Sequence, residues 1–134
     1  MASVIDASMQ ALFLALAGVT LLLGGAAIAN TTLVSVVERT SEIGLRRALG
    51  ASPGAIMAQI LIETAISGAL AGLVGASLGI LSVIAVALAF NWTALAPSWV
   101  VPLGPAVGAA VGLISGVYPA WKAAHIDPIA ALRR

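Results

Sequence analysis

Long runs without charged residues dominate the chain, and short polar segments separate them. No charged residue occurs between Asp6 and Glu38, and the densest apolar part of this run covers residues 11–37. Two further apolar runs cover residues 64–90 and 103–120. Because a membrane-spanning helix needs about 20 predominantly apolar residues, the pattern predicts an all-α integral membrane protein in which each of these three runs forms a transmembrane helix.

Composition supports a membrane protein. The chain has 134 residues, of which 61% are hydrophobic and 8% are charged, whereas about a quarter of the residues of a soluble domain are charged. The net charge of +1 gives no basis for binding nucleic acid. The absence of cysteine excludes a disulfide framework, thiol chemistry and cysteine metal ligands. The sequence predicts no catalytic residue, no cofactor site and no metal site.

The basic residues predict the orientation in the membrane. All six lie in two segments, Arg39, Arg46 and Arg47 after the first predicted span and Lys122, Arg133 and Arg134 after the third. Residues 91–102, which contain two prolines and two tryptophans, have none and fit a turn at the membrane surface. The positive-inside rule then puts the segment between the first two spans and the tail, residues 121–134, in the cytoplasm, and the N-terminus outside.

This orientation bears on whether the chain is complete. The first ten residues, "MASVIDASMQ", lack the basic region and short apolar core of a signal peptide. An external N-terminus without a signal peptide, in a chain with three spans, is unusual for a whole protein. We therefore expect a fragment that lacks an upstream span and an extracytoplasmic domain. A naturally short protein is the alternative.

The polar segment after the first span carries the signals of a short helix at residues 41–49. Thr40 or Ser41 can cap its N-terminus, and Gly50 suits the left-handed position after a helix end. The Ser-Pro pair at 52–53 is typical of an N-cap followed by the first residue of the next helix. The sequence thus predicts a discrete helix of two to three turns.

The two sides of this short helix differ in polarity. Leu45, Ala48 and Leu49 fall on one stripe, while Glu42 and Arg46 are spaced to form an ion pair one turn apart. Such a helix can lie at the membrane interface with its arginines on lipid phosphates. It can equally dock in a groove of a cytoplasmic partner, with its apolar residues as anchors. The spacing alone does not decide between the two.

Two motifs give the chain a family resemblance. The stretch "SEIGLRRALGASPGAIMAQILIE" resembles the signature of the FtsX-like permease domain, the family of MacB and the LolC/LolE lipoprotein-release permeases. The matching residues are Glu42, Ile43, Gly44, Arg46, Ala48, Gly50, Ala51, Gln59 and Glu63. The ending "YPAWKAAHIDPIAALR" is similar to the family's C-terminus, at Tyr118, Pro119, Ala120, Ala123, Asp127, Pro128, Ala131, Leu132 and Arg133. The two motifs bracket the second and third spans in the family's order.

The resemblance implies the membrane subunit of an ABC transporter in a bacterial inner membrane. In the family the short cytoplasmic helix is the coupling helix that docks on the ATPase. Carried over to this chain, the docking residues are Glu42, Ile43, Gly44, Leu45, Arg46, Arg47, Ala48, Leu49 and Gly50. Family members have four spans with a large extracytoplasmic domain between the first and second, so this chain corresponds to the last three spans.

The function that the resemblance implies is mechanical. The chain contains no phosphate-binding loop of the Gly-x-x-x-x-Gly-Lys-Ser/Thr type, so ATP and Mg²⁺ belong to a partner ATPase or a missing domain, and the chain itself is not an enzyme. ATP hydrolysis is expected to move an extracytoplasmic domain, in efflux or in lipoprotein or lipid release. A second permease copy or a paralogue is an expected partner. The rival hypothesis is a small membrane scaffold or oligomeric channel, assembled through glycine-rich helix faces.

Two predicted spans carry glycines at regular spacing. The residues expected at helix contacts are Gly68, Gly72, Gly75, Gly79, Gly104, Gly108, Gly112 and Gly116. Small residues at a four-residue spacing let helix backbones approach closely in lipid. The contacts can join the second and third spans or two copies of the chain.

Three other features receive structural interpretations. Ser77 lies in a Gly-x-Ser-x-Gly pattern, but it is in the middle of a predicted span and far from His125, so we reject a nucleophile there. Glu63 is expected at the cytoplasmic interface with Gln59 as its hydrogen-bonding partner. Asp127 and Pro128 are expected to begin a short cytoplasmic helix that reaches Arg134. The C-terminal motif residues singled out are Tyr118, Pro119, Asp127, Pro128 and Leu132.

Overall fold

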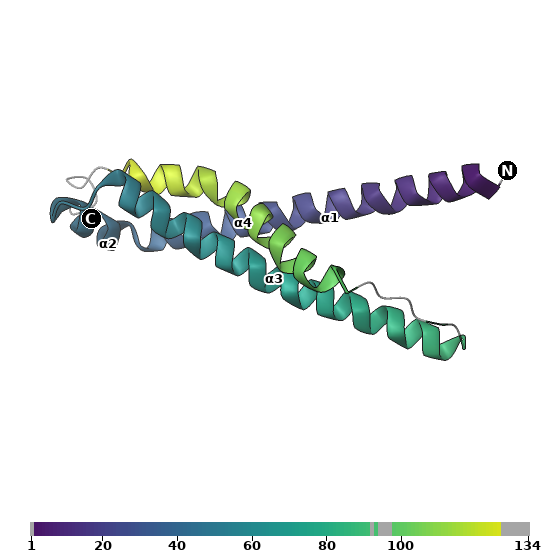
Figure 1. Ribbon diagram of the computed structural model, residues 1–134. Coiled ribbons are helices and arrows are strands. Elements are labelled where there is room, and N and C mark those ends of the chain that lie inside the picture. The colour runs from purple at the N-terminus through teal and green to yellow at the C-terminus, as the bar shows by residue number, and fades with distance from the viewer. Residues whose placement is uncertain (1, 92, 94–97, 127–134) are drawn as a thin grey trace.

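The structure is a computed structural model that describes residues 2–91, 93 and 98–126. All the regular structure in this part of the chain is helical (Figure 1). The helices are α1 (Ala2–Glu38), α2 (Thr40–Ala48), α3 (Pro53–Ala89) and α4 (Val100–Ala124). Of these described helices, α1, α3 and α4 are long and apolar enough to cross a membrane. The all-α fold with three apolar spans is therefore confirmed.

The long helices extend beyond the apolar runs that predicted them. α1 and α3 have 37 residues each, which corresponds to about 55 Å at 1.5 Å per residue, whereas the hydrocarbon core of a bilayer is about 30 Å thick. α4 includes residues 100–102 of the expected surface turn and continues to Ala124 in the expected tail. The apolar run sets the length of the predicted span, while helical backbone hydrogen bonding continues through the polar residues beyond it.

α3 and α4 pack against each other as an antiparallel pair along a seam of glycines. Gly68 lies against Gly108 and Gly112, Gly72 lies against Gly104 and Gly108, and Gly112 and Gly116 lie against Thr64. As the residue number rises along α3 it falls along α4, which makes the pair antiparallel. A Cβ atom added at Gly68 or Gly108 would overlap the carbonyl oxygen of the other. The two backbones are therefore in direct contact. We call Gly68, Gly72, Gly104, Gly108, Gly112 and Gly116 the glycine seam.

Two of the eight glycines expected at helix contacts lie outside the seam. A Cβ atom added at Gly75 or Gly79 would have no atom of the described residues within 4 Å beyond its own helix surroundings. Ala76, four residues after Gly72, continues the face that meets α4, and its side chain lies against Gly104. The regular spacing identified the contact face up to Gly72, but the glycines beyond it turn away from that face.

α1 lies against α4 and has few contacts with α3. Gly25 in α1 lies beside Val111 and Ser115 in α4. Beyond this contact the N-terminal part of α1 leaves the other helices, and the far ends of α1 and α3 diverge (Figure 1). Residues 5–24 of α1 are exposed along their whole length. Their side chains are largely apolar, a surface that suits lipid or another membrane helix.

The tightest side-chain packing lies at the end of the molecule where α2 joins α1 and α3, which we call the α2 end. The buried cluster there comprises Val36, Ile43, Ile56, Ile60, Ala120 and Ala123. Its residues come from all four described helices. The hydrophobic core of the described chain therefore includes one side of the short polar helix that the sequence singled out.

Candidate functional site

α2 follows α1 through a bend at a single residue, Arg39. Helical hydrogen bonding continues across the bend, since the Ile43 amide donates to the Arg39 carbonyl at 3.0 Å. The Thr40 hydroxyl donates back to the Val36 carbonyl, also at 3.0 Å, and caps nothing. The prediction that Thr40 or Ser41 caps α2 is therefore wrong. The Ile43 amide, in the first turn of α2, already has a backbone acceptor at the bend and needs no capping side chain.

The other end of α2 follows the sequence-based prediction. Gly50 has a φ of 99°, a left-handed conformation that favours glycine, and its amide donates to the Arg47 carbonyl at 3.1 Å. The Ser52 hydroxyl accepts from the Ala55 amide at 3.2 Å, and Pro53 is the first residue of α3. The left-handed glycine and the serine cap are confirmed. The segment that connects α2 to α3 is therefore only a few residues long.

The nine residues expected to dock on an ATPase occupy different sides of α2. Ile43 and Gly44 are buried against the rest of the chain. Leu45 and Leu49 point outward, with 51% and 80% of their surface exposed, and Ala48 is exposed beside them. The apolar surface that α2 offers to another molecule is the stripe of Leu45, Ala48 and Leu49. Ile43 and Gly44 attach α2 to its own chain.

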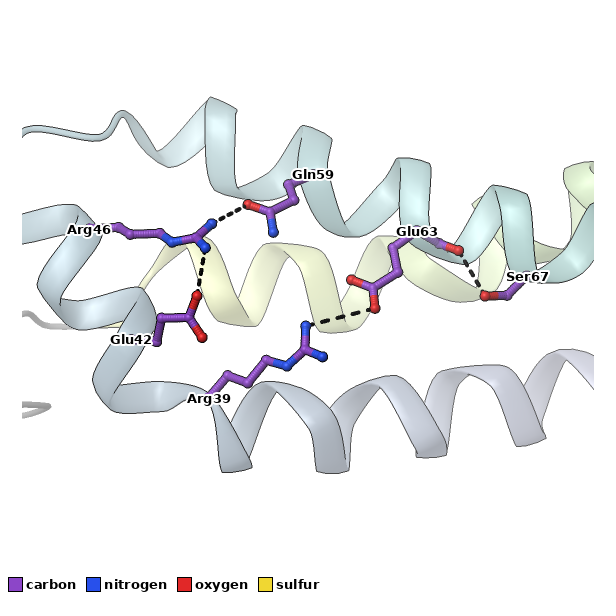
Figure 2. Close-up of polar contacts among 6 residues, drawn as sticks. All are labelled: Arg39, Glu42, Arg46, Gln59, Glu63 and Ser67. Atoms are coloured by element: carbon purple, nitrogen blue, oxygen red, sulfur yellow. Dashed lines mark hydrogen bonds and ion pairs between the residues drawn. The ribbon is translucent and has the colours of Figure 1, made fainter.

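A forked set of polar contacts joins α2 to α3, as Figure 2 shows. The Arg46 guanidinium donates through Nη1 to Oε1 of Gln59 at 2.9 Å and through Nη2 to Oε1 of Glu42 at 2.5 Å. The ion pair between Glu42 and Arg46, expected from their spacing, is confirmed. A guanidinium presents its donors in a rigid plane, so the two acceptors fix its orientation. Glu42, Arg46 and Gln59 thus form one set of polar contacts between α2 and α3.

A second polar contact lies one turn further along α3. Nη1 of Arg39, the residue at the bend, lies 3.9 Å from Oε1 of Glu63, and both side chains are about half exposed. The Glu63 carbonyl accepts from the Ser67 hydroxyl at 2.9 Å (Figure 2). The expected pairing of Gln59 with Glu63 is not formed. Each of these side chains instead contacts an arginine from the α1–α2 segment.

These contacts lie in a polar groove between α1 and α3. The groove has a volume of about 210 Å³, and its lining includes Arg39, Glu42, Arg46, Gln59 and Glu63. Hydroxyl side chains extend it toward the middle of the helices, and several of them donate to carbonyls of their own helix, as Thr32 does to Ile28 at 2.8 Å. The side chains of the groove are arranged to hold helices together and to neutralise each other's charge. They do not form a pairing of nucleophile and base.

Arg47 is partly buried, which the docking hypothesis did not anticipate. Its Nε atom is buried without a hydrogen-bonding partner among the described residues. Arg47 lies four residues after the buried Ile43, and this spacing places both on one side of the helix. The spacing was the signal that could have separated Arg47 from the outward residues. Arg39 was also missed as a functional residue, although the opposite charge on Glu63 could have indicated a partner.

The C-terminal motif is described only in part. Tyr118 is exposed and Pro119 is buried inside α4. Asp127, Pro128, Leu132 and the expected helix at 127–134 lie outside the described residues. In α3 the Ser77 hydroxyl donates to the Leu73 carbonyl at 2.8 Å, which agrees with its rejection as a nucleophile.

Comparison with known proteins decides the family. A sequence profile described as "FtsX-like permease C-terminal" matches residues 14–128. The chain belongs to the FtsX-like permease family. The resemblance inferred from the two motifs is therefore confirmed, and the profile covers α2, α3, α4 and most of α1.

Relatives of this FtsX-like permease chain include transporters from several bacteria. It is 42% identical to the uncharacterized ABC transporter permease YknZ of Bacillus subtilis, over 96% of the chain and 32% of YknZ. It is 42% identical to the macrolide export ATP-binding/permease protein MacB of Rhodopirellula baltica, over 92% of the chain and 18% of that protein. It is 40% identical to the pyoverdine export ATP-binding/permease protein PvdT of Pseudomonas aeruginosa, over 87% of the chain and 18% of that protein. The FtsX-like chain thus spans a third or less of the length of these relatives.

Proposed function

We propose that this chain is the membrane portion of a MacB-like ABC transporter and that α2 is its coupling helix. The observation that carries the proposal is the outward apolar stripe of Leu45, Ala48 and Leu49 on a helix whose other side is built into the hydrophobic core. A helix held in this way can receive force from a partner and pass it to the membrane helices. The family membership and the names of MacB and PvdT, which include ATP binding, support an ATPase as that partner.

The orientation proposed from the basic residues fits this role. Arg39, Arg46 and Arg47 all lie at the α2 end, which the positive-inside rule assigns to the cytoplasm, where an ATPase would bind. The far ends of α1 and α3 then face the other side of a bacterial inner membrane. We propose that the far end of α1 connects there to an extracytoplasmic domain outside this chain. ATP hydrolysis would move that domain and drive efflux or the release of a lipid or lipoprotein.

We further propose that two permease copies assemble, as a homodimer or with a paralogue. The exposed apolar length of α1, residues 5–24, supports contact with further membrane helices. The rival function, a small scaffold or channel built through its glycine faces, has less support, because the glycine seam is used between α3 and α4 of one chain. Gly75 and Gly79 remain exposed to other molecules.

The docking surface can be tested at Leu49, since a substitution of this largely exposed residue leaves the fold intact. We expect Leu49→Asp to weaken copurification with the ATPase about tenfold or more, because an apolar anchor is worth about 1.5–3 kcal/mol when it is fully buried in an interface. Leu49→Met is the matched control and should bind like the original chain. ATPase binding by Leu49→Asp that equals binding by Leu49→Met would contradict docking through α2. Charge reversal of Arg46 is less informative, since Arg46 is engaged within the chain.

A further inference from the structure

The chain changes direction at both ends of α2. On one side the direction of the chain changes at the single residue Arg39, and on the other side at Gly50, whose φ is 99°. The angle of α2 is therefore set by its contacts with the other helices. The buried Ile43 and Gly44 hold α2 from one side only, since Leu45 and Leu49 on the other side are exposed. A further contact must fix the angle of α2 if α2 is to transmit force to the membrane helices.

One stripe of α3 contacts both ends of the segment that contains α2. Gln59 and Glu63 are four residues apart and therefore lie one turn apart on the same side of α3. Gln59 accepts from Arg46, in the last turn of α2, and Glu63 pairs with Arg39, at the bend. The stripe spans α2 from the bend to its last turn, as Figure 2 shows for these side chains.

The two contacts differ in quality. Both ion pairs are about half exposed, but the Arg39–Glu63 pair is a single contact at 3.9 Å, and such a pair contributes little because water screens it. Arg46 instead makes two charge-assisted hydrogen bonds from one rigid fork, to Gln59 at 2.9 Å and to Glu42. Because Glu42 is in α2 and Gln59 is in α3, the fork fixes the orientation of α2 relative to α3.

We propose that Arg46 and Gln59 are positioning residues that fix the angle between α2 and α3, so that movement imposed on α2 reaches α3 and is not lost where the chain changes direction. This role rests on the proposed function of α2 as the coupling helix. Arg46 then acts inside the chain, and contact with the ATPase falls to Leu45, Ala48 and Leu49. Docking and transmission are carried by different residues of the same helix.

The first experiment measures the position of α2 relative to α3 in the absence of the ATPase. The chain has no cysteine, so Leu49→Cys and Leu78→Cys, both at exposed positions, provide a unique pair of spin-label sites within it. Residues 53–78 of α3 span about 38 Å at 1.5 Å per residue, a separation suited to pulsed EPR. We expect one narrow distance distribution for the parent chain and a broader or shifted one for Gln59→Leu, which removes the acceptor.

Two matched variants control this measurement. Gln59→Glu keeps an oxygen acceptor for Arg46 and should restore the narrow distribution. Ser67→Ala changes the same groove, but its hydroxyl donates only to the carbonyl of Glu63 in its own helix, so the distribution should stay narrow. An unchanged distribution in Gln59→Leu would overturn the proposal.

The second experiment adds the ATPase, with the whole transporter in nanodiscs. Labels at Phe13→Cys and Leu88→Cys, exposed near the far ends of α1 and α3, report motion across the membrane when ATP is added. In Gln59→Leu we expect ATPase binding to be retained and the ATP-induced change in distance to be lost, with rescue by Gln59→Glu. Retention of the full change in Gln59→Leu would overturn the positioning role.

The two experiments separate failure of this inference from failure of the proposed function. If the parent transporter bound its ATPase and showed no distance change with ATP, or bound no ATPase at all, the coupling function would be wrong. The distances between Leu49→Cys and Leu78→Cys, measured without the ATPase, would still decide whether Arg46 and Gln59 fix α2 on α3.

Discussion

The two contacts made by α3 are built on opposite principles. Toward α4, glycines bring the two backbones together, and no side chain separates them at Gly68 and Gly108. Toward α1, a groove of about 210 Å³ separates the helices, and long polar side chains such as Arg39 and Glu63 reach across it. One contact is fixed by the shape of the backbone, and the other by side chains that can change rotamer.

The difference indicates which parts of the molecule move together. Close backbone contact leaves only one distance at which α3 and α4 fit, so these helices form a rigid pair. Arginine and glutamate side chains have many rotamers, so α1 and α3 can change their separation while remaining joined. The contact between α1 and α3 across the polar groove, made through Arg39 and Glu63, is therefore the more adjustable of the two.

The largest effect is expected in the glycine seam. Gly108→Ala places a Cβ atom where the Gly68 carbonyl oxygen lies, and forced overpacking of this kind costs about 1–3 kcal/mol. We expect a marked fall in the thermal unfolding temperature of the detergent-solubilised protein. Gly75→Ala and Gly79→Ala, where a Cβ atom meets open space among the described residues, are the matched controls and should unfold like the parent. Equal unfolding temperatures for Gly108→Ala and Gly79→Ala would refute the rigid backbone contact.

A smaller and partly reversible effect is expected at Gly116. A Cβ atom added there meets the side chain of Thr64, which is fully buried. Gly116→Ala should destabilise the protein by about 1–2 kcal/mol, and the second substitution Thr64→Ala should recover part of this loss by removing the obstructing atoms. The same second substitution should not rescue Gly108→Ala, whose obstacle is backbone. Unfolding measurements on the double variants, compared with Thr64→Ala alone, test this distinction.

The smallest effect is expected at the ion pair across the groove. Arg39→Gln should change the free energy of unfolding by less than about 1 kcal/mol, because exposed ion pairs contribute little. The charge-swapped variant Arg39→Glu/Glu63→Arg should match the parent in low salt, whereas Arg39→Glu alone should be slightly destabilised there and less so in high salt. If Arg39→Gln lowered the free energy of unfolding as much as Gly108→Ala does, the contact across the groove would be as rigid as the glycine seam.

Much of the fold was accessible from the sequence. The charge-free runs predicted three apolar helices, and the glycines at 104, 108, 112 and 116 predicted a contact face because a strict four-residue repeat stays on one side of a helix. Gly75 and Gly79 do not meet α4, since the face that meets α4 continues through Ala76. Which side of a helix meets its neighbour depends on the crossing geometry, and this is a property of two helices together.

The site was predicted where its interactions are local. The pair of Glu42 with Arg46 and the cap at Ser52 both follow from spacings within one turn. The partners of Gln59 and Glu63 did not follow, because Arg46 and Arg39 approach them from another helix. The expected cap at Thr40 failed for a related reason, since it required knowing that α1 continues to the bend.

The free part of α1 has a geometrical consequence. Residues 5–24 extend about 30 Å beyond the contact at Gly25, while α2 and its polar groove lie on the other side of that contact (Figure 1). A rigid arm pivoting there would sweep its tip by about 5 Å for a rotation of only about 10°. The proportions of α1 are therefore those of a lever, in which a small rotation beside Arg39 gives a displacement of several ångströms at the other end of the helix.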